Sequence, residues 1–367
     1  MAPGRTTPSF FEGQAAARRR TALLLLGFAL AVAMVVGIVY LGLLVPVGMK
    51  AGAVGWWNGR LLLFTSAGVL GVTAVGAAWH AVALGADGGD AVARRLGGVP
   101  VARGSNDLAA RRFLGVLDEM AIAAGLPVPR GYVLPDEKGI NAFAAGATPG
   151  RSVVVVTRGA LDRLSRDELQ GVVAHELSHV LHADVRLNGR LLALVGGLGA
   201  LSALGRLVWR AGWSARGRGA AQGRAVGSLA GAALAFAGWA GRLCGEVLRF
   251  AVVREREYLA DAAAVQFTRN PAGLAGALRK VAAQGSLLAA PQAEAVSHFL
   301  FANGVAGVLE TWFATHPPVE ERIRRLGAGE VLGASATGRT TPVSRRCDVR
   351  PSPEDPHLAA DIDRRPE

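Results

Sequence analysis

The sequence predicts a mainly α-helical membrane protein that carries one small α+β domain. Residues 21–49 and 61–86 contain no charged side chain, and each run exceeds the roughly 20 apolar residues that cross a bilayer as a helix. Short extended segments and capped helices follow these runs and indicate the α+β domain. Composition agrees, because 51% of the 367 residues are hydrophobic and 49 are glycine.

The two apolar runs are expected to be retained transmembrane helices within residues 21–86. The first follows Arg18, Arg19 and Arg20, but it is about twice as long as the apolar part of a secretory signal. The arginines should stay in the cytoplasm with the rest of residues 1–20, and two crossings then return the chain to that side. We therefore expect a multi-pass protein of the inner (plasma) membrane whose main soluble domain faces the cytoplasm.

The formal net charge of +12 favours contact with membrane lipid over contact with nucleic acid. The arginines lie at the ends of apolar runs and in the tail, and they form no basic helix with interleaved aromatic residues. Only two cysteines occur, Cys244 and Cys347, so no disulfide framework is expected. This agrees with a reducing compartment.

Residues 87–190 are predicted to form the first part of the soluble domain. Ser105 or Asn106 can cap a helix that ends at Gly125 and Pro127. Three short extended segments follow this helix, at residues 131–134, 141–146 and 152–157. A turn signal, TPG at 148–150, lies between the last two, so a small antiparallel sheet is predicted.

A helix with a well-defined start carries the most distinctive motif. Ser165 and Glu168 form a capping box, and the helix that follows contains HELSH at 175–179. His175 and His179 are four residues apart, so both rings can reach one ion. Zinc accepts such a pair with a third protein ligand and keeps one position for water, which Glu176 can deprotonate as general base.

The alternative for this motif is a polar surface helix with incidental histidines. That alternative must explain why three of the seven histidines lie between residues 175 and 182, although HExxH alone does have false positives. His182 is seven residues from His175, roughly 10 Å along the helix axis, which is too far to share one ion. We interpret His182 as a supporting or surface residue.

A downstream helix supplies a third ligand in the stretch RFAVVREREYLADAAAVQFTRN at 249–270. Glu257 and Asp261 are four residues apart, so Glu257 can ligate while Asp261 accepts the N–H of a ligand histidine. Glu255 competes for the ligand role but has no carboxylate four residues later. The alternative for Glu257 is a surface carboxylate paired with a neighbouring arginine, Arg254 or Arg256.

Two further apolar stretches separate the motifs, at 191–205 and 225–241, within a segment assigned to residues 191–250. Their small residues suit close helix packing, and their connection is rich in arginine, so membrane crossing stays open. His179 and Glu257 must meet, so the intervening chain crosses twice or not at all. Residues 251–330 complete the catalytic domain, and 331–367 are expected to be a disordered tail.

These segments together resemble the HtpX-like membrane zinc metallopeptidases of metallopeptidase family 48, relatives of the CAAX prenyl proteases. After two amino-terminal spans, the matching pieces follow the family's order: NAFAAG, VVVVTRGALDRLSRDELQGVVAHELSHVLHAD, REREYLADAAAVQFTRNP and THPPVEERIRRL. They cover nearly everything from residue 10 to 327 and are far more specific than HExxH alone. The long Gly- and Arg-rich insert departs from the simplest family pattern and leaves the number of spans open.

The resemblance implies a zincin-type (gluzincin) metallopeptidase domain. One Zn²⁺ per chain would be bound by His175, His179 and Glu257, with Glu176 as the base and Asp261 supporting a ligand histidine.

The resemblance also implies residues that contact the substrate. Asn141, Ala142 and Phe143 would lie on an edge strand that binds an extended substrate backbone. The carboxy-terminal motif makes His316 a candidate oxyanion donor and Arg322 a candidate orienting group. A structural turn histidine is an equal alternative for His316, and the isolated His80 and His298 are more often packed than catalytic.

The prediction is therefore a membrane zinc metalloendopeptidase, and by resemblance its polypeptide substrates are misfolded membrane proteins in envelope quality control. The alternative is a non-catalytic membrane protein with a structural zinc site, which would normally have a fourth protein ligand. A transporter or scaffold would need ionisable residues in its spans, and His80 is the only one in the first two. A processing protease for lipidated peptides would need more spans. Cleavage preference and oligomeric state do not follow from the sequence.

Overall fold

The computed structural model describes residues 10–51, 57–85, 88–146, 148–214, 220–284 and 317–327. Most of these residues are helical, and four short strands form one sheet. The predicted fold class, a mainly α membrane protein with an α+β domain, is confirmed. The expected tail at 331–367 lies outside the described residues.

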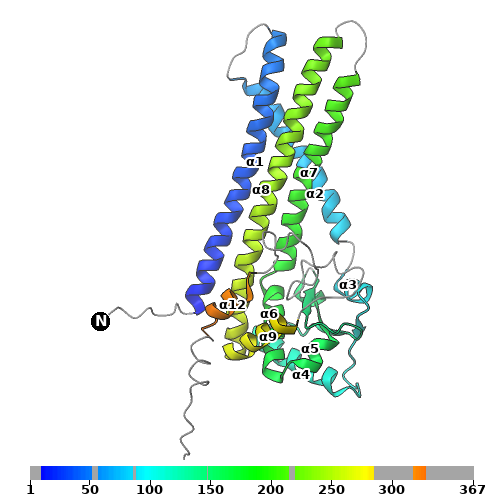
Figure 1. Ribbon diagram of the computed structural model, residues 1–367, viewed down its shortest axis with the longest axis vertical. Helices are drawn as coiled ribbons and strands as arrows, with labels where there is room; N and C mark the ends of the chain where they lie inside the picture. The colour runs from blue at the N-terminus through cyan, green and yellow to red at the C-terminus, as the bar shows by residue number, and fades with distance from the viewer. Residues whose placement is uncertain are drawn as a thin grey trace, which may run out of the picture. The chain divides into compact units, whose positions relative to one another are not determined.

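Four long helices pack along one another: α1 (Phe10–Ala51), α2 (Gly59–Gly85), α7 (Asp184–Ser214) and α8 (Ala220–Thr268). Helix α8 contacts both α1 and α7, and α2 packs against α7 (Figure 1). Among the residues that the structure describes, three segments are long and apolar enough to cross a membrane. They are Arg18–Leu44, Gly59–Val82 and Asp184–Ser214.

The outer faces of α1, α2 and α7 carry large apolar side chains that water would hydrate poorly. More than half of the side-chain surface is exposed at Leu23, Leu26, Leu30, Leu63, Phe64, Trp79 and Leu207. Exposed apolar surface on this scale marks contact with lipid or protein. The protein is therefore a membrane protein, as predicted, and the stretch 191–205 belongs to the third apolar segment.

Small residues allow α7 and α8 to approach closely, as their composition predicts. A Cβ atom on Gly205 would lie 2.2 Å from the backbone nitrogen of Ala235, and one on Gly231 would lie 2.4 Å from that of Trp209. Glycine is needed at both positions because any side chain would push the helices apart.

The sheet is mixed. Its strands are β1 (Val99–Pro100), β2 (Arg130–Leu134), β3 (Ala142–Ala145) and β4 (Val153–Thr157), in the order β1-β2-β4-β3. The antiparallel expectation holds for β3 with β4, but β2 and β4 are parallel. Strand β1, which was not predicted, pairs antiparallel with β2. The reason is that β4 inserts between β2 and β3, so β3 lies at the edge and β2 gains a parallel neighbour.

Both faces of the sheet are buried, which explains the unbroken apolar run VVVV in β4. Val154 and Val156 point into the larger core, together with Ala142 and Ala144 of β3. Side chains on the opposite face, including Tyr132, Phe143 and Val155, pack beneath α3 (Gly89–Arg95).

Asp107 caps α4 (Leu108–Ala124), so the predicted cap at Ser105 or Asn106 is wrong. The Asp107 carboxylate accepts from the backbone N–H groups of Ala109 and Ala110, and it also pairs with Arg158 of α5 (Arg158–Arg163). A carboxylate that satisfies two helix N–H groups and a cation is a better cap than a neutral side chain there. The helix ends, as predicted, at Gly125 with φ of 66°.

The capping box at the start of α6 (Arg166–Leu181) is confirmed. Ser165 accepts from the Glu168 N–H, and the Glu168 carboxylate accepts from the Ser165 N–H. Helix α9 (Pro271–Gln284) packs against α6 so closely that a Cβ on Gly171 would lie 2.7 Å from the Leu274 nitrogen. The last described helix, α12 (Val319–Arg325), packs against α9.

Candidate active site

Helix α6 carries His175, Glu176 and His179 beneath the sheet. His175 and Glu176 are buried, whereas 16% of the His179 side chain is exposed. The helix ends at Leu181 with His182 as its C-cap, and Ala183 has a φ of 55°, which turns the chain sharply so that α7 begins at Asp184. The motif therefore lies where α6 ends and an apolar helix begins.

Helix α8 brings Glu257 to the two histidines, so one ligand atom from each residue lies within 4.8 Å of the others. The Nε2 atoms of His175 and His179 are 3.1 Å apart, and Glu257 lies 3.3 Å from His179 Nε2 and 3.8 Å from His175 Nε2. Bonds of about 2.0–2.1 Å to a tetrahedral metal ion place ligand atoms about 3.4 Å apart. The observed distances between ligand atoms, 3.1, 3.3 and 3.8 Å, lie on both sides of that value.

The outer nitrogen of each ring is bound to a carboxylate. His175 Nδ1 lies 2.9 Å from Asp261 Oδ1, and His179 Nδ1 lies 2.9 Å from Asp184 Oδ2. An Nδ1–H that donates to a carboxylate leaves a lone pair on Nε2. Two lone pairs that face each other beside a third carboxylate repel unless a cation lies between them, so these residues fit a metal ion.

The charges around the two histidines differ. Burial lowers the pKa of His175 to about 4, so its ring is neutral. Burial also acts to lower the pKa of His179, but hydrogen bonds to Asp184 and Glu257 outweigh it and raise that pKa well above its usual range. The pocket thus attracts positive charge next to His179, which a metal ion would supply.

Glu176 lies beside the three candidate ligands. Its Oε1 atom is buried and has no hydrogen-bond partner among the residues that the structure describes. Burial raises the pKa of Glu176 to about 7, with Glu257 adding to the increase, while the Ala144 N–H opposes it. A carboxylate with one unsatisfied oxygen and a pKa near neutrality is suited to exchange protons.

Arg322 of α12 is buried and forms a double hydrogen bond with Asp261. Its Nε lies 2.9 Å from Asp261 Oδ2 and its Nη2 lies 2.7 Å from Asp261 Oδ1. Its Nη1 lies 3.7 Å from a Glu257 oxygen. Burial opposes ionisation of Asp261, but Arg322 and His175 lower the pKa of this carboxyl to about 2.

Asp184 and Arg256 belong to the same cluster, and the sequence reasoning missed their role. Arg256 donates to the carboxylate of Asp184, which in turn binds His179. The sequence analysis considered Arg256 only as an alternative to Arg254 for an ion pair with Glu257. The available signal in the sequence was Asp184 itself, five residues after His179. The contact of Asp184 with Arg256, however, depends on how α7 packs against α8.

The competing ligand Glu255 does not join this cluster. It pairs with Arg20 of α1 at 3.2 Å, on a different face of α8 from Glu257. His182 also stays outside the cluster, because its Nδ1 lies 2.9 Å from the Ser178 carbonyl oxygen, to which it can donate.

Asn141, Ala142 and Phe143 lie where the edge strand begins, with Asn141 just before β3. The Thr157 N–H donates to the Asn141 carbonyl. Because antiparallel pairs alternate, the backbone groups of Ala142 and Ala144 then point away from β4. Asn141 is itself buried, and its side chain accepts from the Ala142 N–H at 2.9 Å.

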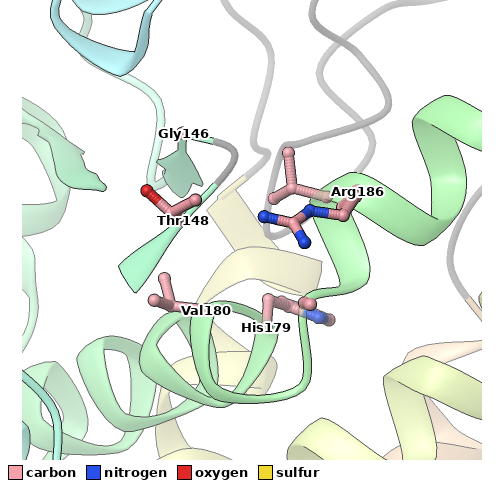
Figure 2. Close-up of a pocket in the computed structure, with 7 residues that line it drawn as sticks. Gly146, Thr148, His179, Val180 and Arg186 are labelled. Carbon is pink, nitrogen blue, oxygen red and sulfur yellow. The ribbon is translucent and has the colours of Figure 1, made fainter. Parts of the chain in front are cut away.

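A small pocket opens next to His179, between the end of β3 and the start of α7. Figure 2 shows Thr148 and Arg186 above His179 and Val180 of α6. Gly146, Ala183 and Val185 complete its lining. The candidate ligands are therefore approached from the side of His179, which agrees with its greater exposure than that of His175.

Three further histidines that the sequence analysis considered remain to be placed. His80 is exposed on α2 and lines a cavity with Trp79 and residues of α7. His298 and the predicted oxyanion donor His316 lie outside the described residues.

The membrane helices and the buried His-His-Glu cluster beside Glu176 define a membrane-bound metallopeptidase. The chain belongs to peptidase family M48, whose model matches residues 108–329. It is 40% identical over 216 residues to a protein named "Protease HtpX homolog" of Dictyoglomus turgidum, which covers 58% of this chain and 68% of that protein.

Two further relatives carry the same printed name. That of Lactobacillus helveticus is 38% identical over 58% of this chain and 71% of its own length. That of Leuconostoc citreum is 34% identical over 84% of this chain and 96% of its own length. The predicted resemblance to HtpX-like metallopeptidases is confirmed.

Proposed function

We propose that the protein is a zinc-dependent endopeptidase in which His175, His179 and Glu257 bind the metal ion. The observation that carries the proposal is the convergence of their ligand atoms within 4.8 Å, next to the unsatisfied oxygen of Glu176. When bound, zinc would polarise the scissile carbonyl and lower the pKa of water.

Glu176 acts as general base and then as general acid. Its Oε1, which has no partner among the described residues, accepts a proton from the attacking water, and its raised pKa lets it hold that proton at neutral pH. It then gives the proton to the leaving amine. The Ala144 N–H binds the Glu176 carboxylate to the edge strand, so the same strand positions both the base and the substrate backbone.

The edge strand β3 and the surrounding charges orient the substrate and the ligands. The N–H groups of an extended peptide can donate to the outward carbonyls of Ala142 and Ala144, which supports the assignment of residues 141–143 to substrate binding. Asp261 and Arg322 hold His175, and His316 remains the candidate oxyanion donor.

The site faces the cytoplasm from the inner membrane in this proposal. The ion pair between Arg20 and Glu255 supports it, because it joins the basic start of α1 to the part of α8 that carries Glu257. By the positive-inside rule, that end stays in the cytoplasm. Helix α8 then crosses the membrane together with α7. The domain boundaries are those of the six segments expected from the sequence. The proposed substrates are misfolded membrane proteins.

The test is to purify the full chain in detergent and to measure zinc content and cleavage of an unfolded membrane protein. Glu176→Gln should keep zinc and lose cleavage, whereas Glu257→Ala should lose both. Glu255→Gln is the matched control on the same helix and should keep both. A wild type that binds zinc without cleaving would favour a structural metal site, and one that binds no zinc would favour a scaffold. Wild-type cleavage by Glu176→Gln would rule out Glu176 as the base.

A further inference from the structure

We propose that Asp184 and Arg256 form a positioning pair that holds His179 in its metal-binding orientation. The inference rests on the proposed function, because it concerns a ligand of that site. Neither residue is one of the three candidate ligands. Asp184 contacts His179 and Arg256 contacts Asp184, so each would act through His179 rather than as a catalytic residue.

The contacts form a chain of three groups. His179 Nδ1 lies 2.9 Å from one oxygen of Asp184, to which its N–H donates. The other oxygen of Asp184 accepts from Arg256 through its Nε and Nη2 groups. Both oxygens of the carboxylate are thus engaged, which fixes its plane and the direction in which the ring points.

Arg256 also fixes the backbone at the break between α6 and α7. Its Nη2 donates to the His182 carbonyl at 3.1 Å, just before Ala183, whose φ of 55° turns the chain. One guanidinium therefore binds both sides of the turn that brings Asp184 back toward His179. Lysine has a single cationic centre and could not reproduce this planar fork.

Little water reaches these groups. The exposed fraction of the side chain is 10% for Asp184, 12% for Arg256 and 16% for His179. Solvent competes weakly for such charged hydrogen bonds, so the orientation they impose on the ring persists.

The arrangement repeats on the other histidine, where α8 contributes the carboxylate instead of the guanidinium. His175 is held by Asp261, which is held by Arg322 of α12. Each candidate ligand histidine thus has its own carboxylate and guanidinium, and carboxylates that bind ligand histidines fix the tautomer and raise ligand basicity. The His179 set differs in that its carboxylate is the first residue of α7, an apolar helix long enough to cross a membrane.

The experiment compares Asp184→Asn, Arg256→Gln, Arg256→Lys and the double variant Asp184→Asn/Arg256→Gln in the detergent-purified full chain. The apparent Kd for zinc is measured by competition with a chelator, and kcat and KM are measured separately. We expect about 10- to 100-fold weaker zinc binding and a lower kcat with KM unchanged, as for other residues that orient metal ligands.

The double variant should bind zinc no more weakly than the worse single variant, because the two residues act as one unit. The matched control is Arg254→Gln, which removes an exposed arginine from the same helix and should leave zinc affinity unchanged. Arg256→Lys keeps the charge and is the decisive variant if Arg256→Gln does not fold.

The outcomes separate this inference from the proposed function. A wild-type protein that binds no zinc overturns the proposed function itself. A wild type that binds zinc and cleaves, with Asp184→Asn and Arg256→Lys equal to it in zinc affinity, overturns only the positioning pair. Lower thermal stability with unchanged zinc affinity and kcat would also overturn it, because the pair would then only stabilise the fold.

Discussion

Arg322 and Asp261 are joined by two parallel hydrogen bonds, of 2.9 and 2.7 Å, inside the protein. The pair ties α12 to α8, two helices that are 61 residues apart at this contact. Burial of a charge without a partner is costly, so each residue depends on the other. The carboxy-terminal motif therefore completes the surroundings of His175.

Removal of the Arg322 guanidinium should weaken both fold and metal site. Arg322→Met leaves Asp261 buried without its cation, which typically costs about 3–5 kcal/mol. Arg322→Lys keeps the charge but loses the bidentate geometry, so zinc affinity should fall about 10-fold or more. Thermal unfolding and chelator competition measure the two effects. The exposed Arg324→Lys on the same helix is the control, and equal loss there would contradict the assignment.

Metal removal should lower the stability of the wild type. A ligand at 100 times its Kd stabilises the folded state by about 2.7 kcal/mol, so a chelator should lower the thermal midpoint and added zinc should restore it. Glu176→Gln should show the same shift because the three ligands remain. Glu257→Ala should show almost none. A chelator shift of wild-type size in Glu257→Ala would show that the ion binds elsewhere.

The ionised form of Glu168 should stabilise the start of α6 only above acidic pH. Burial opposes ionisation, but Lys280, whose Nζ lies 2.6 Å away, and the Ser165 N–H lower the pKa of Glu168 below 4.5. Its contribution is present above pH 4.5 and is lost as pH falls through the lowered pKa.

Glu168→Gln should therefore destabilise the protein by up to about 1 kcal/mol at pH 7 and by less near pH 3. Thermal unfolding of the metal-free protein at both pH values measures this, so that loss of metal in acid does not contribute. The exposed Glu320→Gln is the control for removal of a surface carboxylate. A Glu168→Gln deficit that is constant with pH would rule out the charge as its cause.

Close packing of α7 on α8 should be necessary for the metal site as well as for the fold. Gly205→Val places side-chain atoms where a Cβ would already lie 2.2 Å from the Ala235 nitrogen, and overpacking of this kind costs about 1–3 kcal/mol. Because Asp184 begins α7, the shift should also weaken zinc binding. Gly189→Ala, with no atom within 4 Å of the added Cβ, is the control. Equal zinc affinities for the two variants would argue against this coupling.

Local patterns determined much of the candidate site. One helix, whose capping box is recognisable in the sequence, carries His175, Glu176 and His179. The four-residue spacing of Glu257 and Asp261 follows the same helical period. Residues within four positions of one another meet whatever the rest of the chain does. The apolar runs likewise determined that helices α1 and α2 are membrane segments.

The parallel pairing of β2 with β4 was decided by tertiary structure. Strand order depends on which edge β3 occupies, and nothing in the alternation of apolar residues distinguishes the two edges. The Asp107 cap also depends on tertiary contact, since Arg158 binds the same carboxylate from another helix.

By itself, the sequence determined which residues can bind a metal ion and which helices are apolar enough for a membrane. Only the tertiary structure decided how Glu257 meets the histidines and that Arg256 and Arg322 reach two different carboxylates. The physical reason is range: helical periodicity fixes neighbours a few residues apart, whereas contacts across 60 to 150 residues depend on how whole helices pack.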